Sequence, residues 1–283
     1  MADTYRPSHT HSRPSGNTHS GGASHHNPTT RQPRNSSHGA THGSPHSAGG
    51  RSSHTGFNRN DFQFSYSGYQ KPRNSSKNVY VATAVLGVVF VFLTVSIALH
   101  APYISAIDSV AAAPLYVMQN TMLTAFFGTI TFLGEVKTVI ILCVIVAIVL
   151  VLQRNWHKLV IFAGGMIVGE VICYVIKFII ARARPTGHNL IDLPTDPSFP
   201  SGHAFGTCLF FMLVAAMLYG YLQREGTSPF ISALPYIIAG LLTLIVGTSR
   251  IYLGVHWPTD VLCGWLLGLV FALPVGRMLR LRS

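Results

Sequence analysis

Long runs of apolar residues follow one another along most of the chain, and polar residues gather in the short stretches between them. Six of these runs are long enough to cross roughly 30 Å of hydrocarbon as helices. They predict an all-α fold, a six-span transmembrane helical bundle. The predicted spans are residues 79–99, 136–152, 159–180, 204–222, 230–248 and 257–278.

The stretch between the first two predicted spans is about 35 residues long and contains Pro102, Asp108 and Pro114. It also contains amphipathic segments such as MLTAFFGTITFLG. This length and polarity favour helices at the membrane interface over a seventh span.

Residues 1–70 have a different composition, dominated by Ser, His, Gly, Asn, Thr and Pro, with only two acids, Asp3 and Asp61. Such a segment cannot bury enough apolar surface to offset its ordering entropy, so we expect a disordered tail before a membrane domain at residues 79–283. The tail holds most of the 14 histidines, but their irregular spacing without cysteine is not typical of a metal site.

The net charge of +11 owes much to this tail, and the sequence has no folded basic face or nucleic-acid-binding motif. We therefore expect no nucleic-acid partner. A basic tail beside a membrane can contact anionic lipids, and a solvated linker is the plainer alternative.

The lysines and arginines between the spans predict the orientation, because short cytoplasmic loops are enriched in them. The richer side, predicted to be the cytoplasm together with both termini, has Lys71, Arg73, Lys77, Arg154, Lys158, Arg224, Arg277, Arg280 and Arg282. The opposite side has fewer, namely Lys137, Lys177, Arg182, Arg184 and Arg250.

Three polar clusters stand at the ends of spans on that second side. The third span ends in KFIIARARP, the fourth begins after PSGH at residues 200–203, and the fifth leads into SRIYLGVHWPTD at residues 249–260. Two spans separate the first two clusters from the third. All three clusters must then lie at the same membrane surface.

The clusters together suit a phosphate group. A helix that begins at Ser201, Gly202 and His203 offers unpaired N–H groups to an anion. Arginine grips phosphoryl oxygens in bidentate fashion and lysine adds a point charge, which gives roles to Lys177, Arg184 and Arg250. His256 and Asp260 are four residues apart on one helix face, so the carboxylate can orient the imidazole.

Each cluster also has a structural interpretation by itself: a helix cap, the snorkelling ends of a span, or a buried His–Asp pair. Their coincidence on one surface is harder to explain structurally, because cations near lipid are costly without an anion.

The set Lys-x6-Arg-Pro, Pro-Ser-Gly-His and Ser-Arg-x5-His-x3-Asp resembles the type 2 phosphatidic acid phosphatase superfamily, the lipid phosphate phosphatases. The resemblance covers residues 79–283 and is closest to bacterial membrane members. It implies a metal-independent phosphatase without a cofactor, working through a phosphohistidine. His256 would attack phosphorus, Asp260 would orient it, and His203 would protonate the leaving oxygen. The phosphoryl group would be held by Lys177, Arg184, Ser201, Gly202 and Arg250.

The motifs define the phosphoryl group of the substrate and say nothing about its tail. A site at the bilayer surface suits a lipid phosphate or diphosphate, whose tail stays in the membrane. Undecaprenyl diphosphate is favoured because an outer-face site suits the recycling of that carrier, with phosphatidylglycerophosphate and phosphatidate as alternatives. A vanadium-dependent haloperoxidase is a rival that six spans argue against. A non-catalytic lipid-binding protein is a second rival, but it would be expected to carry a broken motif.

Three polar residues near the clusters stay outside the motifs. Glu170, inside the third span, could neutralise a neighbouring cation or line a substrate groove. Arg182 and His188 receive no chemical role. Four cysteines lie within apolar runs and are expected to be free thiols: Cys143, Cys173, Cys208 and Cys263.

Overall fold

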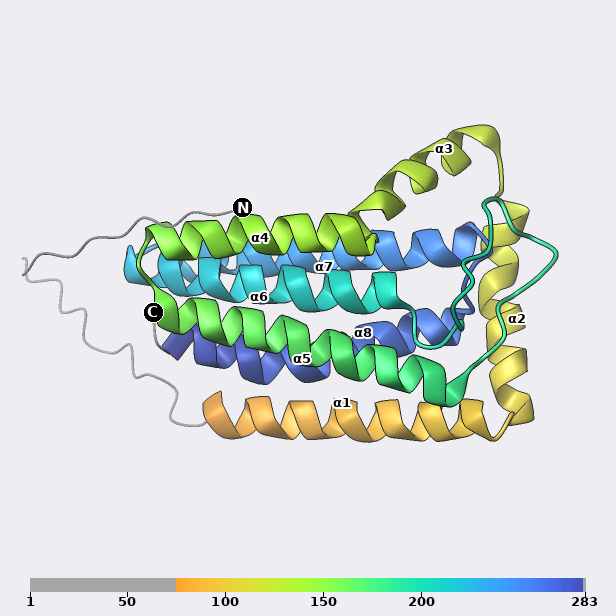
Figure 1. Cartoon of the computed structure of the whole chain (residues 1–283), viewed down its shortest axis with the longest axis horizontal. Helices are drawn as coiled ribbons and strands as arrows, with labels where there is room; N and C mark the ends of the chain where they lie inside the picture. The colour runs from red at the N-terminus through yellow and green to blue at the C-terminus, as the bar shows by residue number, and fades with distance from the viewer. Residues whose placement is uncertain (1–74, 282–283) are drawn as a thin grey trace, which may run out of the picture. The chain divides into compact units, whose positions relative to one another are not determined.

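The computed structural model describes residues 75–281, which form one 3-10 helix and eight α-helices within one compact unit (Figure 1). No β-strand occurs in this range, so the all-α fold class is confirmed. The predicted tail at residues 1–70 lies outside the described residues. The helices are α1 (Ser75–Ala98), α2 (Pro102–Val117), α3 (Thr121–Ile130), η1 (Thr131–Gly134), α4 (Val136–Leu152), α5 (Trp156–Ile180), α6 (Gly202–Arg224), α7 (Pro229–Tyr252) and α8 (Pro258–Leu281).

Five helices are long and apolar enough to cross a membrane: α1, α5, α6, α7 and α8. A sixth candidate is α4 together with the preceding segment Thr121–Gly134, a pair bent by 50°. The membrane bundle predicted from the apolar runs is therefore confirmed, and each predicted span overlaps one of these helices.

The polar stretch after α1 forms α2 and α3, and neither is long enough to be a span by itself. In Figure 1, α2 stands across the end of the bundle, transverse to the long helices. The next helix, α3, runs obliquely from the α2 side toward the beginning of α4. Contacts of α2 with α7 and α8 fix it at the end where α6 and α8 begin. The expectation that these helices lie along the membrane surface stays a prediction, and α3 also belongs to the bent pair that could form a sixth span.

The most extensive contact in the bundle is between α6 and α8, and glycines of α8 make it close. A Cβ at Gly264 would lie 2.7 Å from the carbonyl oxygen of Ser201 and 3.0 Å from Cβ of Ala204. A Cβ at Gly268 would lie 2.7 Å from Cβ of Cys208. Small residues allow membrane helices to approach closely, so this packing brings the beginnings of α6 and α8 together.

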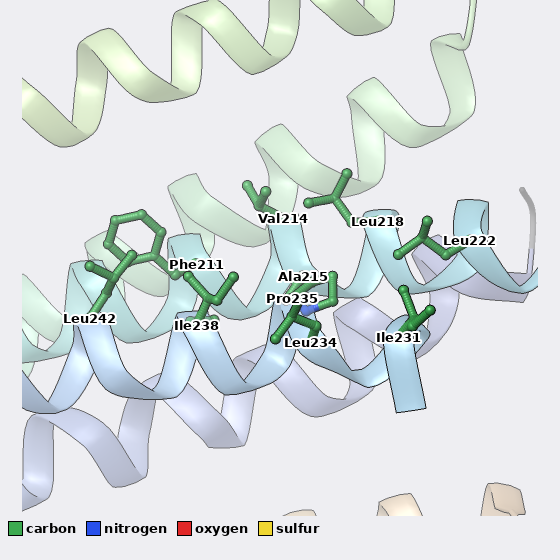
Figure 2. Close-up of a pocket in the computed structure, with 11 residues that line it drawn as sticks. Phe211, Val214, Ala215, Leu218, Leu222, Ile231, Leu234, Pro235, Ile238 and Leu242 are labelled. Atoms are coloured by element: carbon green, nitrogen blue, oxygen red, sulfur yellow. The ribbon is translucent and has the colours of Figure 1, made fainter. Parts of the chain in front are cut away.

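Figure 2 shows an apolar crevice of about 240 Å³ between α6 and α7, with Leu218, Ile231 and Pro235 in its lining. It runs along the second half of α6, away from the residues Ser201–His203 where that helix begins. The crevice is thus part of the apolar exterior of the bundle and is remote from the sequence motifs.

Candidate active site

The three motif clusters meet at one end of the bundle. The end of α5, the loop 181–201 and the beginning of α6 contact the turn between α7 and α8. The backbone N–H of Ser201 donates to the carbonyl of Asp260 at 3.1 Å, and Nη1 of Arg184 lies 3.2 Å from Nε2 of His256. His203 is close enough to interact electrostatically with three positive charges, those of Lys177, Arg184 and Arg250.

A tight turn after α7 presents His256. Gly254 has φ +73°, and a Cβ there would lie 2.2 Å from the carbonyl oxygen of His188, so only glycine fits. Asn189 closes the same contact by donating to the carbonyl of Gly254. The loop 181–201 is therefore fastened to the turn, and the His256 side chain is almost completely buried.

The contacts of His256 define its tautomer. Arginine can only donate, so Nε2 of His256 accepts the hydrogen bond from Arg184 and Nδ1 carries the proton. Nδ1 lies 3.6 Å from Oδ2 of Asp260. Burial lowers the pKa of His256 to about 4, although the Asp260 carboxylate acts to raise it. The imidazole is therefore neutral at pH 7, with its lone pair directed to the Arg184 side.

The Asp260 carboxylate is fully buried and accepts from several groups. Oδ2 accepts from the backbone N–H of Trp257 at 3.0 Å and from the hydroxyl of Ser198. Oδ1 accepts from Nη1 of Arg182 at 2.6 Å. The sequence motifs include neither Ser198 nor Arg182, so half of the carboxylate's environment comes from the loop 181–201.

Lys177 and Arg184 both contact the carboxylate of Asp196. Nζ of Lys177 lies 3.0 Å from Oδ2, and Nη2 of Arg184 lies 2.9 Å from Oδ1. Burial acts to raise the pKa of Asp196, but the hydrogen bonds and charges of the two cations outweigh it and lower the pKa below its usual value. Two predicted phosphate ligands are thus paired with a half-exposed carboxylate from the loop that joins them to α6.

Two other predicted phosphate ligands have unpaired polar atoms. Oγ of Ser201 and Nε of Arg250 are buried and have no hydrogen-bond partner among residues 75–281. Ser201 stands at the N-cap position of α6, yet its side chain makes no capping hydrogen bond. Unpaired buried donors are costly, so these two atoms are suited to bind the oxygens of an anion.

The segment η1 completes this side of the site, which the motifs did not indicate. Nη1 of Arg250 donates to the hydroxyl of Thr131 at 2.9 Å. A Cβ at Gly134 would lie 2.9 Å from Cδ2 of His203, so the missing side chain makes room for the imidazole. A glycine at a tight helical turn was the only sequence signal for this contact.

An apolar groove of about 490 Å³ runs between α4 and α5 up to Gly202 at the beginning of α6. Its lining includes Val139, Met166 and one carboxyl side chain, Glu170. Oε1 of Glu170 lies 3.1 Å from where a Cβ of Gly206 would stand. Of the two expected roles for Glu170, the structure supports the lining of the groove, and no ion pair of Glu170 occurs in the described part of the chain.

Comparison with known proteins gives concordant matches. The family model described as the PAP2 superfamily matches residues 158–282. Phosphatidylglycerophosphatase B of Bacillus subtilis is 31% identical over 186 residues, which are 63% of this chain and 86% of that protein. An undecaprenyl-diphosphatase of Sulfolobus acidocaldarius is 30% identical over 146 residues, 50% of this chain and 65% of that protein.

A solved structure agrees with these matches. The crystal structure of a transmembrane PAP2 type phosphatidylglycerolphosphate phosphatase from Bacillus subtilis superposes with a TM-score of 0.61 and 28% identity. The superposition covers 68% of this chain and 93% of that one.

Proposed function

Because this chain belongs to the PAP2 superfamily, it is a lipid phosphatase of the membrane, and we propose that it hydrolyses undecaprenyl diphosphate at the outer membrane face. The observation that carries the proposed mechanism is the geometry of His256. Its Nε2 lone pair is directed to Arg184, and its Nδ1 is directed to Asp260.

In the proposed reaction, Nε2 of His256 attacks the terminal phosphorus and forms a P–N bond while the bond from phosphorus to the leaving oxygen breaks. His203 gives a proton to that oxygen. It then takes a proton from water, which attacks the phosphohistidine and releases inorganic phosphate and free His256. Asp260 holds the Nδ1 proton of His256 throughout.

The phosphoryl group needs positioning and charge stabilisation more than covalent assistance. Ser201 and Arg250 supply their unpaired donors, and the backbone of Gly202 at the beginning of α6 lets an oxygen approach. Lys177 and Arg184 add charge, and Asp196 must share these two cations with the phosphoryl group.

The groove between α4 and α5 supports a substrate with a long apolar tail, because it is open along the bundle and reaches Gly202. The name of the Sulfolobus relative favours undecaprenyl diphosphate. Phosphatidylglycerophosphate is the second candidate, because the Bacillus relative is named as a phosphatidylglycerophosphatase. This chain matches most of the length of that relative.

The test is phosphate release by the purified full chain in detergent, with undecaprenyl diphosphate, phosphatidylglycerophosphate and phosphatidate as substrates. We expect the highest kcat/KM for undecaprenyl diphosphate, unchanged activity in chelator and inhibition by vanadate. A tenfold preference for another lipid would reassign the substrate. If the folded protein released phosphate from none of the three lipids, the proposed function would be contradicted.

The proposed orientation has its own test in intact cells. Asp192, on the loop 181–201, and Gln153, at the opposite end of the bundle, are both exposed. In a background without the four native cysteines, Asp192→Cys should react with a membrane-impermeant thiol reagent and Gln153→Cys should not. The reverse labelling would show that the active site faces the cytoplasm.

A further inference from the structure

Arg182 lies between two buried carboxylates that come from distant parts of the chain. Its Nη1 is 2.6 Å from Oδ1 of Asp260, and its Nη2 is 2.6 Å from Oδ2 of Asp108 on α2. Asp108 is 1% exposed and Asp260 0%. The guanidinium also lies over the ring of Trp257, 5.6 Å from its centroid, which restricts its plane. Arg182 is thus fixed from three sides.

Asp108 also holds the beginning of α8. Its Oδ1 accepts from the backbone N–H of Thr259 at 2.8 Å, and its Oδ2 accepts from the Thr259 hydroxyl at 3.0 Å. Thr259 is the second residue of α8, where helices leave backbone N–H groups unpaired. A carboxylate there also interacts favourably with the helix dipole. The cap of α8 therefore comes from α2.

These contacts determine which oxygen of Asp260 faces the imidazole. Oδ1 is bound by Arg182, which leaves Oδ2 as the oxygen near Nδ1 of His256. Without Arg182, Oδ1 would be a buried charged atom with no cation, and only the contacts of Oδ2 with Ser198 and Trp257 would hold the carboxylate. Asp108 in turn binds the other terminal nitrogen of the Arg182 guanidinium, Nη2, and so restricts its position.

We propose that Asp108 and Arg182 are positioning residues, through which the surface helix α2 holds the His256–Asp260 pair in its reactive geometry. This inference rests on the proposed role of His256 as nucleophile. It assigns Arg182 a different task from Lys177, Arg184 and Arg250. Those three cations are proposed to bind the phosphoryl group, whereas Arg182 contacts Asp260, Asp108 and the Thr259 hydroxyl and acts on the reaction through Asp260.

The test is a double-mutant cycle with an aryl phosphate as substrate. Arg182→Gln in the parent should lower kcat by roughly 100-fold, because a small misplacement of reacting groups has that effect, while KM changes by less than about threefold. In an Asp260→Asn background the same substitution should lower kcat by less than about threefold, because the residue it acts through has changed. Equal losses in both backgrounds would overturn the proposal.

Vanadate distinguishes positioning from direct binding. Its inhibition constant should stay within about threefold of the parent value in Arg182→Gln, because Arg182 does not face the phosphoryl pocket. A tenfold weaker inhibition would show that Arg182 binds the phosphoryl group directly, and would overturn the proposal.

Asp108→Asn is the second variant, because its amide oxygen can still accept from Thr259 while the charge that pairs with Arg182 is lost. We expect a roughly tenfold fall in kcat with unchanged KM, because Arg182 loses one of its two carboxylate partners and positions Asp260 less firmly. Asp192→Asn, an exposed acid of the loop 181–201, is the matched control and should retain parental kcat. A parental kcat in Asp108→Asn would remove α2 from the proposal.

Folding is checked by size exclusion in detergent for every variant. The aryl substrate makes the cycle independent of the lipid question. If the lipid assignment is wrong, the result of the double-mutant cycle does not change. If Arg182→Gln and Asp260→Asn show no coupling in kcat, only the positioning role is contradicted.

Discussion

The surroundings of His256 and the groove between α4 and α5 are held by different kinds of contact. Around His256, side chains from α2, the loop 181–201 and α8 contact one another through ion pairs and hydrogen bonds. The groove is lined by apolar side chains, with Glu170 as an exception. Directional contacts fix atoms, whereas apolar contacts fix only a volume. The first region is therefore suited to specify a reaction and the second to accept a class of apolar tails, as the proposed function requires.

The largest effect should follow from removing the nucleophile. His256→Ala should lower kcat by roughly 10,000-fold or more on every substrate, because the proposed nucleophile that forms the covalent intermediate is lost. The measurement is phosphate release from a lipid diphosphate and from an aryl phosphate. Substantial recovery on the aryl substrate would mean that His256 is the acid and His203 the nucleophile.

His203→Ala should instead depend on the leaving group. For a lipid alcohol phosphate, loss of the acid should cost ~100-fold to 10,000-fold, because an alkoxide needs a proton to leave. An aryl phosphate should recover much of the rate, and a diphosphate should fall between the two. The ratio of mutant to parent kcat/KM is compared across the three substrates. Equal losses on all of them would contradict the acid role.

The smallest effect should come from narrowing the groove. Ala163 on α5 lines it, about 20 Å along the helix from Lys177. Ala163→Trp should raise KM for the lipid by roughly tenfold, about 1.4 kcal/mol of binding, and leave the aryl phosphate unaffected. Val168→Trp, on an exposed part of α5 outside the groove, is the control. An equal rise for both variants would show that the tail lies elsewhere.

The sequence was sufficient for the spans and for the grouping of the motif residues at one end of the bundle. Each predicted span is a long apolar run, a signal that needs no knowledge of neighbouring helices. The motif residues could be placed on one surface because each stands at the end of a span, so counting crossings fixes the side on which it lies. His256, Asp260 and Arg184 do meet at the end of the bundle.

The supporting residues could not be found in this way. Asp108 stands 151 residues before Thr259, within a segment whose pattern indicated only a surface helix. Its contact depends on how α2 packs across the bundle end, and helical periodicity does not encode that angle. Arg182 and Asp196 lie in an irregular loop, where no repeating pattern shows which way a side chain points. The sequence assigned Arg182 no role, whereas the structure gives it two carboxylate partners.

The cap that Asp108 provides for α8 also determines when the reactive pair can form. During synthesis α2 emerges long before α8, so Asp108 lacks these partners until the later helices of the bundle have been made. Only the arrival of Thr259 and Asp260 gives Asp108 and Arg182 their full set of partners. A nascent chain that has not yet made α8 would therefore have the proposed nucleophile, His256, without the framework that orients it, and we expect phosphatase activity only when the bundle is closed.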